Sequence, residues 1–323
     1  MTTPPDLSII IVNWNSREFL RRCLTSLRNG SGGLAHEVIV VDNASFDGSA
    51  EMIALEFPHV RFIQSEANLG FSRGNNLGFS YSSGRVLLFL NPDTEVVGAA
   101  LDTLLAFADT HPDVGIVGAR LLNSDLTLQM ESVRAFPSLA NQILESHYLK
   151  WRFPRLSIWG MRPLFDTSTK PARVEVVSGA CLMIKREVFE RVGRFSTEYF
   201  MYSEDVDLCH KVKVAGWATF YVGSAEVVHH GGRSSALSPV SAFAAVLIRE
   251  SRFRFLRLAR SNVYAITYRV ITAMNAMCRL ALLFVLFPFF RVFRKAAPIK
   301  TIDKWFRILR WSVGLERWVK TPG

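Results

Sequence analysis

Short apolar runs alternate with amphipathic segments along the first 90 or so residues of the chain. Four runs have the length and β-branched character of buried strands: Ser8–Val12, Glu37–Val41, Val60–Gln64 and Val86–Leu90. Between them, apolar positions recur at helical spacing and predict helices over Glu18–Leu27, Ser49–Phe57 and Gly74–Ser83. Strands joined by helices in this way predict a parallel sheet covered on both faces, in a Rossmann-like nucleotide-binding layer.

Polar residues follow three of these strands directly. Asn13–Asn15 comes after the first, Asp42–Asp47 after the second and Asn91–Asp93 after the fourth. Ligands of such sheets bind beyond the carboxyl ends of the strands, so we expect a site at this edge.

The second half of the body is less regular. Residues 124–171 carry four prolines and several aromatic residues and predict an extended excursion. Strand character returns at Val174–Ile184, and helices are predicted at Arg186–Val192 and Ser203–Ala215. Two short strands are expected to close the body, over Gly216–Val222 and Glu226–His230.

Several candidate residues have both a chemical and a structural interpretation. Asp93, at the end of an apolar strand, could hold Mg²⁺ or Mn²⁺ against a diphosphate, although Asn-Pro-Asp is also an ordinary turn. Glu204 and Asp205 open a helix, where a carboxylate could act as a general base or interact favourably with the helix dipole. In the latter case Ser203 could cap the helix. His229 could bind a metal or phosphate, or be structural.

A stretch rich in glycine and asparagine, Asn68–Gly78, enters a predicted helix. It could let the backbone approach a ligand closely, or it could form an ordinary loop and helix cap.

The order of the motifs is more specific than any one of them. It reads SIIIVNWN, VVDNASFDGS, NLGFSRGNN, LLFLNPDTE, SGACLMIKREVFERVGRF, FMYSEDVDLCHK and VVHHGGRSS. The chain thereby resembles family 2 glycosyltransferases, most closely the rhamnosyltransferase-like subgroup, from about Leu7 to Ser235. This resemblance implies the α/β GT-A fold, with a Rossmann-like nucleotide-binding mixed sheet.

The resemblance also implies a role for each matched position. Asn13, Asn15 and Asp42 would hold the nucleotide, with Asp42 facing a pyrimidine base. Asp205 would be the base that deprotonates the acceptor hydroxyl, with Glu204 as its companion.

Asp93 and His229 would hold a divalent cation, Mg²⁺ or Mn²⁺. The chain departs from the family at Asn91, which replaces the first aspartate of the DxD motif, as is usual in this subgroup. It also departs at Asn75, where many relatives have an arginine. We assign Asn75 and Asn76 to the nucleotide, with Arg73 as an alternative.

The chain changes character near its C-terminus. From Arg249 to Gly323 there are 16 lysines and arginines against 3 acidic residues, whereas the whole chain has a net charge of +10. The apolar run Ile271–Phe290 is interrupted by Arg279 and is expected to end at Pro288, so Leu280–Phe290 is too short to span a bilayer. Basic and aromatic residues flank this run, as in helices lying at an anionic membrane surface.

A basic appendage, a dimer contact and a true span are the alternatives for this segment. Nucleic-acid binding is not expected, because no recognition motif accompanies the charge. We therefore predict a catalytic domain over residues 1–240 and a basic helical segment over 241–323. The excursion at 124–171 would face the acceptor.

The expected function is inverting transfer of a sugar, possibly rhamnose, from a dTDP- or UDP-sugar. The acceptor would be a hydroxyl of a cell-surface glycan or a lipid-linked saccharide. A UDP-hexose or GDP-sugar donor is an alternative, as is a non-catalytic nucleotide-sugar binder or membrane scaffold. Four separated cysteines and no visible secretory signal favour the cytoplasm, at the inner face of the membrane.

Overall fold

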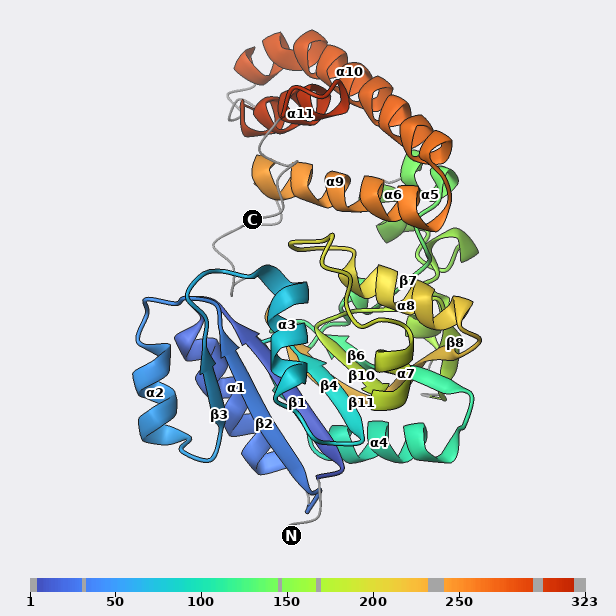
Figure 1. Cartoon of the computed structure of the whole chain (residues 1–323). Helices are drawn as coiled ribbons and strands as arrows, with labels where there is room; N and C mark the ends of the chain where they lie inside the picture. Colours follow the sequence, from blue (N-terminus) through green and yellow to red (C-terminus); the bar gives the residue numbers. More distant parts are fainter. Residues whose placement is uncertain are drawn as a thin grey trace.

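The computed structural model describes residues 5–30, 33–144, 147–166, 170–231, 241–292 and 299–316. Within them the chain forms a mixed sheet with helices on both faces, and a layer of three C-terminal helices lies over one end (Figure 1). The strands of the large sheet are β1 (Leu7–Asn13), β2 (His36–Asp42), β3 (Arg61–Gln64), β4 (Val86–Leu90), β5 (Thr94–Val96), β6 (Val114–Leu122), β8 (Ala172–Val174), β10 (Cys181–Lys185) and β11 (Ala218–His229).

The sheet combines a parallel half with a mixed half. Its main order is β3-β2-β1-β4-β10-β6-β11-β5, with β8 beside β11. The first four strands pair in parallel, as the sequence predicts. β10 runs antiparallel to both β4 and β6, so the sheet as a whole is mixed. β7 (Val133–Arg134) and β9 (Val176–Val177) form a separate ribbon.

Successive side chains of a strand point to opposite faces of the sheet, which explains why helices cover both faces. In β1, Ile9 and Ile11 point into one core and Ile10 into the other. The first core is covered by α1 (Arg17–Gly30), α2 (Ser49–Glu56) and α4 (Ala100–Thr110). The second is covered by α3 (Gly70–Ser80), α7 (Arg186–Arg191), α8 (Glu204–Val214) and α9 (Ala242–Ala259).

Small elements fill the excursion at residues 124–171. They are η1 (Met130–Ser132), α5 (Leu139–Ile143), α6 (His147–Arg152), η2 (Ser157–Trp159) and η3 (Arg162–Phe165). Their apolar side chains, with Trp159 and Met161 buried, form a small core of their own against Tyr221 of β11. The excursion is therefore packed, although its sequence shows no simple period.

Three local predictions were wrong. The expected strand Val174–Ile184 is divided among β8, β9 and β10, because its parts pair with different strands: β8 with β11, β9 with β7, and β10 with β4 and β6. The two strands expected between residues 216 and 230 form one long β11, with an irregularity between Val222 and Glu226 where it pairs with β6.

Pro288 does not end the apolar helix. α10 (Asn262–Val292) runs through it, since a proline removes one helical hydrogen bond without always ending the helix.

The C-terminal helices pack closely together. Trp311 of α11 (Ile299–Ser312) donates from its indole Nε1 to Glu250 of α9 at 2.9 Å. Arg269 of α10 donates to the last carbonyls of α11, at 3.0 Å to Ser312. α9 joins this layer to the body through Ser251, which donates to the carbonyl of Met201. The predicted domain boundary at residue 240 lies in the stretch 232–240, which is outside the described residues.

Candidate active site

The carboxyl ends of β1 and β2 carry a connected group of polar side chains. Asn13 and Asp42 are register partners, and Asn13 Nδ2 donates to Asp42 Oδ1 at 2.7 Å. The other oxygen of Asp42 accepts from the Ser45 backbone at 2.8 Å and from Gln64 Nε2 at 3.0 Å. Both Asn13 and Asp42 are buried, so this network fixes their orientation.

Asn15 shapes the loop beside this group. Its backbone has a φ of 49°, a left-handed conformation that asparagine tolerates better than most residues. Its Oδ1 accepts from the Phe46 backbone at 2.9 Å. The Phe46 side chain is 87% exposed, which leaves an aromatic ring in solvent at the rim of the polar group.

Asn75 and Asn76 lie on α3, and their side chains bond to the protein itself. Asn75 Nδ2 donates to the carbonyl of Phe71 at 3.0 Å. Asn76 exchanges two hydrogen bonds with the backbone of Phe195, at 2.8 and 3.2 Å. Asn76 therefore fastens α3 to the segment that leads to α8.

A second polar group lies where β4 and β11 end. Asp93 is 1% exposed, and its Oδ1 is 3.3 Å from Nε2 of His229. Asn91 Nδ2 lies 3.3 Å from the same nitrogen. His229 Nδ1 lies 2.7 Å from Oε1 of Gln129, whose Nε2 donates to Asn123 Oδ1. This network favours a proton on Nδ1, so that Nε2 presents its lone pair toward Asp93 and Asn91.

The chemistry of this pair is suited to a divalent cation. A buried carboxylate facing an imidazole lone pair is stabilised by positive charge between them. Mg²⁺ and Mn²⁺ sites commonly use few protein ligands and complete their shell with phosphate oxygens and water. No group of three or more histidine, cysteine or acidic side chains gathers around a common point within the described residues.

The third group lies at the start of α8. Arg134 Nη2 donates to Asp205 Oδ2 at 2.5 Å, and the backbone of Gly179 donates to the same oxygen at 3.0 Å. Asp205 Oδ1 accepts from the Val206 backbone at 2.8 Å. A carboxylate has about four acceptor positions, so these donors leave one position on Oδ1 for a further hydroxyl.

The backbone before α8 is constrained. Tyr202 and Ser203 have φ values of 69° and 67°, which are uncommon for residues with side chains. The side chain of Ser203 makes no capping hydrogen bond to α8, so the predicted cap is wrong. Such conformations often occur at functional sites, where the surrounding packing holds them.

Glu204 lies in a different environment from Asp205. Burial, reinforced by the negative charge of Asp205, raises the pKa of Glu204 to about 8. Burial also raises the pKa of Asp207, one turn into the helix. Glu204 is therefore largely protonated at neutral pH.

Hydrogen bonds link the three groups along one edge of the sheet. The backbone of Asn91 donates to Ala180, the neighbour of the Gly179 that holds Asp205. On the other side, Asn43 next to Asp42 donates to Gly70, and Phe71 donates to Phe200 before α8. The edge that the sequence predicted thus brings the groups onto one connected framework.

Gln129, Arg134 and Gly179 are site residues that the sequence did not indicate. The first two lie in the irregular excursion, where no periodicity predicts what a side chain contacts. Gly179 lies so close to Asp205 that an added Cβ would be 3.3 Å from the Asp205 Cβ. Its place in the SGA triplet just before a strand was the only sequence signal.

The chain is similar to proteins of known family. The family model for glycosyl transferase family 2 matches residues 8–193, more than half of the chain. The chain belongs to this family. It is thus a glycosyltransferase, and the site described above lies where its sheet ends.

Two curated relatives match most of the chain. An N-acetylglucosaminyl-diphospho-decaprenol L-rhamnosyltransferase of Mycobacterium tuberculosis is 32% identical over 74% of this chain and 80% of its own length. The rhamnosyltransferase WbbL of Escherichia coli is 27% identical over 78% of this chain and 93% of its own.

Solved structures show the same GT-A fold. A mannosyltransferase from Pyrobaculum calidifontis, in complex with GDP-Man and Mn²⁺, has a TM-score of 0.56 at 14% identity. The match covers 98% of this chain and 89% of the mannosyltransferase chain. GalNAc-T7 with UDP, GalNAc and Mn²⁺ has a TM-score of 0.59 at 16% identity, over 80% of this chain and 48% of its own. The predicted fold class is confirmed.

Proposed function

We propose that this glycosyltransferase moves rhamnose, with inversion, from a dTDP- or UDP-linked donor to a hydroxyl of a lipid-linked saccharide. The observation that carries the proposal is the carboxylate of Asp205, which three donors hold while one acceptor position remains. The names of the two curated relatives support rhamnose as the sugar. That of the mycobacterial relative supports a lipid-linked acceptor.

Asp205 acts as the general base in this proposal. It accepts the proton of the acceptor hydroxyl while that oxygen attacks the anomeric carbon. The nucleoside diphosphate leaves from the opposite face, so a single displacement inverts the anomeric centre. Glu204, kept protonated by burial, adds no second negative charge beside the base at neutral pH.

Asp93 and His229 are the residues that would hold the divalent cation. The cation would supply positive charge to the leaving diphosphate. Gln129 fixes the imidazole of His229 through Nδ1, which keeps Nε2 available. The two solved structures both contain Mn²⁺, which agrees with this assignment.

We assign the donor nucleotide to the edge formed by Asn13, Asn15 and Asp42. Their polar atoms lie beyond the carboxyl ends of β1 and β2, where nucleotides bind in sheets of this kind. Asn75 and Asn76 act indirectly in the proposal, by holding α3 and the segment before α8 in place.

The proposal places the enzyme at the inner face of a membrane. The stretch Asn262–Leu286 of α10 is long and apolar enough, by length and composition, to cross a bilayer. One face of α10 is buried on its neighbours, through residues that include Ala265, Tyr268 and Ala276. A helix with a protein-covered face is better suited to lie in the membrane interface than to cross alone.

The opposite face of α10 would contact the lipid. It carries a stripe of five apolar side chains that are each at least half exposed: Val263, Ile266, Val270, Met274 and Met277. Their spacing of three and four residues puts them on one side of the helix. We call these five residues the α10 stripe.

A thermal-shift panel tests the donor and the cation together. A ligand that binds only the folded state raises the melting temperature. We expect dTDP or UDP to raise it with Mn²⁺ present, more strongly than GDP. In Asp93→Ala, the shift in melting temperature should fall to the value measured without Mn²⁺. Asp303→Ala, on the surface of α11, is the control and should show the wild-type shift. A GDP-specific shift would contradict the donor assignment, and transfer by no nucleotide-sugar at all would contradict the function.

A further inference from the structure

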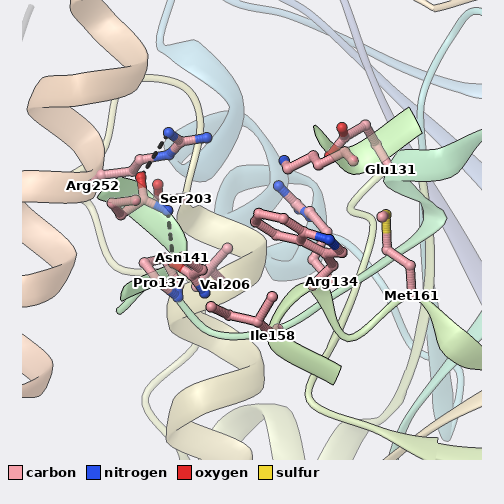
Figure 2. A pocket seen from close by; sticks show the side chains of 13 residues that line it. Glu131, Arg134, Pro137, Asn141, Ile158, Met161, Ser203, Val206 and Arg252 are labelled. Carbon is pink, nitrogen blue, oxygen red and sulfur yellow. Dashed lines mark hydrogen bonds between the residues drawn. The ribbon is translucent and has the colours of Figure 1, made fainter. Parts of the chain in front are cut away.

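A cavity lies between the excursion, the start of α8 and the helix α9. Its volume is about 60 Å³, and it opens to solvent. Figure 2 shows Arg252 on one side of it, across from Arg134 and Glu131. Apolar side chains, among them Ile158 and Met161, form other parts of its wall. The cavity therefore combines charged and apolar surfaces.

Positive charge predominates among the lining residues. The cations are Arg134, Lys150 and Arg252, and the one carboxylate of the lining is Glu131. Arg252 and Arg134 lie within electrostatic range of each other, and Arg252 is oriented by Gln142 at 2.8 Å. Asp205 and Glu131 offset part of this positive charge, and a bound anion would offset more of it.

The cavity adjoins the base. Arg134 lines the cavity and also donates to Asp205, so an anion bound there lies one arginine away from the carboxylate. Ser203 and Val206, on either side of Glu204 and Asp205, are part of the same wall. A molecule whose hydroxyl reaches Asp205 can thus extend into the cavity.

The helix α5 connects the cavity wall to the start of α10. Asn141 and Gln142 of its wall belong to α5, and the first residue of α5, Leu139, donates from its backbone to the Tyr264 hydroxyl of α10 at 2.9 Å. Tyr264 is next to Val263, where the stripe begins. The cavity wall therefore lies one short helix, α5, from the start of the stripe.

We propose that this cavity binds the diphosphate of a lipid-linked acceptor, through Arg134, Lys150 and Arg252. Guanidinium and ammonium groups are the usual protein partners of phosphate oxygens. The inference rests on the proposed function, because it names where the lipid-linked acceptor is held. It assigns the excursion and α9 jointly to acceptor binding.

Binding of octyl diphosphate, measured by calorimetry with EDTA and without donor, tests the cavity alone. EDTA removes the cation that would let a diphosphate bind at Asp93 and His229. We expect Lys150→Ala and Arg252→Gln each to raise the Kd at least about tenfold, since a charge-assisted hydrogen bond contributes about 1.5–3 kcal/mol. Arg257→Gln, at an exposed position of the same helix, should leave the Kd unchanged.

Two comparisons make the result specific. Arg252→Lys keeps the charge and should retain most of the affinity, which a purely structural role of the arginine would not predict. Octyl glucuronide carries one carboxylate in place of the diphosphate and should bind much more weakly. Equal binding of the two compounds would assign the cavity to acidic sugars and overturn the proposal, as would an unchanged Kd in both Lys150→Ala and Arg252→Gln.

Transfer kinetics then connect the cavity to the reaction. With a diphosphate-linked acceptor, the same two variants should raise the acceptor KM about tenfold or more and leave the donor KM unchanged. With the neutral octyl glycoside of the same sugar they should match the wild type, and an equal loss with both acceptors would overturn the proposal. Absence of transfer in the wild type would instead contradict the proposed function, while the binding measurement still decides on the cavity.

Discussion

At the scale of single residues, two adjacent carboxyl groups lie in opposite environments. Asp205 receives hydrogen bonds from a guanidinium and two backbone N–H groups. Glu204 is buried beside that charge and holds its proton. Neighbouring carboxyl groups in different environments can take different roles in one site.

Replacing Asp205 by asparagine tests the base. The amide keeps the shape but cannot accept a proton, so we expect transfer to fall by about 10²–10⁴-fold. The thermal shift caused by the donor nucleotide and Mn²⁺ should stay close to that of the wild type. Asp303→Asn, at an exposed position, is the matched control. Transfer at the wild-type rate in Asp205→Asn would show that another group is the base.

The proton on Glu204 predicts how stability depends on pH. The unfolded chain releases this proton above about pH 4.5, whereas the folded protein keeps it until about pH 8. The folded state then binds more protons, so this group lowers stability as pH rises through that window, by at most about 1.4 kcal/mol per pH unit.

Denaturant unfolding between pH 5 and 8 measures this effect. Glu204→Gln should lose less stability than the wild type as the pH rises, because glutamine has no proton to release. The raised pKa of Asp207 also makes the free energy of unfolding fall as the pH rises, and this contribution remains in Glu204→Gln. Parallel curves for wild type and Glu204→Gln would contradict the burial argument.

At the scale of elements, Trp311 holds the three C-terminal helices together. Its ring is 1% exposed, its Nε1 donates to Glu250 of α9, and the guanidinium of Arg269 of α10 lies over it at 5.2 Å. Because one side chain contacts both other helices, its loss leaves a cavity and removes one of the hydrogen bonds to the Glu250 carboxylate.

Trp311→Ala should therefore lower the free energy of unfolding by about 3–5 kcal/mol. Trp151→Ala, at a position 69% exposed, should change it by less than about 0.5 kcal/mol. Denaturant melts of both variants compare the two. A small loss in Trp311→Ala would mean that α11 contributes little to the layer.

At the scale of the whole molecule, the charge and the apolar surface are concentrated in the C-terminal layer. The stripe on α10 faces away from the body, and α11 adds exposed basic residues such as Lys300, Arg307 and Arg310. A membrane-facing layer next to the acceptor cavity would let the enzyme act on a lipid-linked substrate without extracting it.

Vesicle sedimentation tests this arrangement. We expect the protein to bind vesicles with anionic lipid more tightly than neutral ones, and more weakly at high salt. The double variant Val270→Glu with Met277→Glu should lose most of this binding, yet keep transfer to a water-soluble acceptor. Val214→Glu, at an exposed apolar position on α8, should bind as the wild type does. Wild-type binding by the double variant would exclude the stripe as the contact.

The sequence by itself determined the first four strands, the helices between them and the polar residues that follow them. These depend on local periodicity and on turn chemistry, which a short window contains. Periodicity also placed Glu204 and Asp205 at a helix start, and Asp93 at a strand end. The order of the motifs was enough to identify the family.

Only the tertiary structure decided what each of these residues contacts. Arg134 reaches Asp205 across 71 positions, and Gln129 reaches His229 across 100, so no local pattern could pair them. The same holds for β8, β9 and β10, which come from one apolar stretch and pair with four different strands. Pairing between distant segments depends on how the chain packs as a whole, and that packing brings the proposed base, the candidate cation pair and the proposed acceptor cavity together.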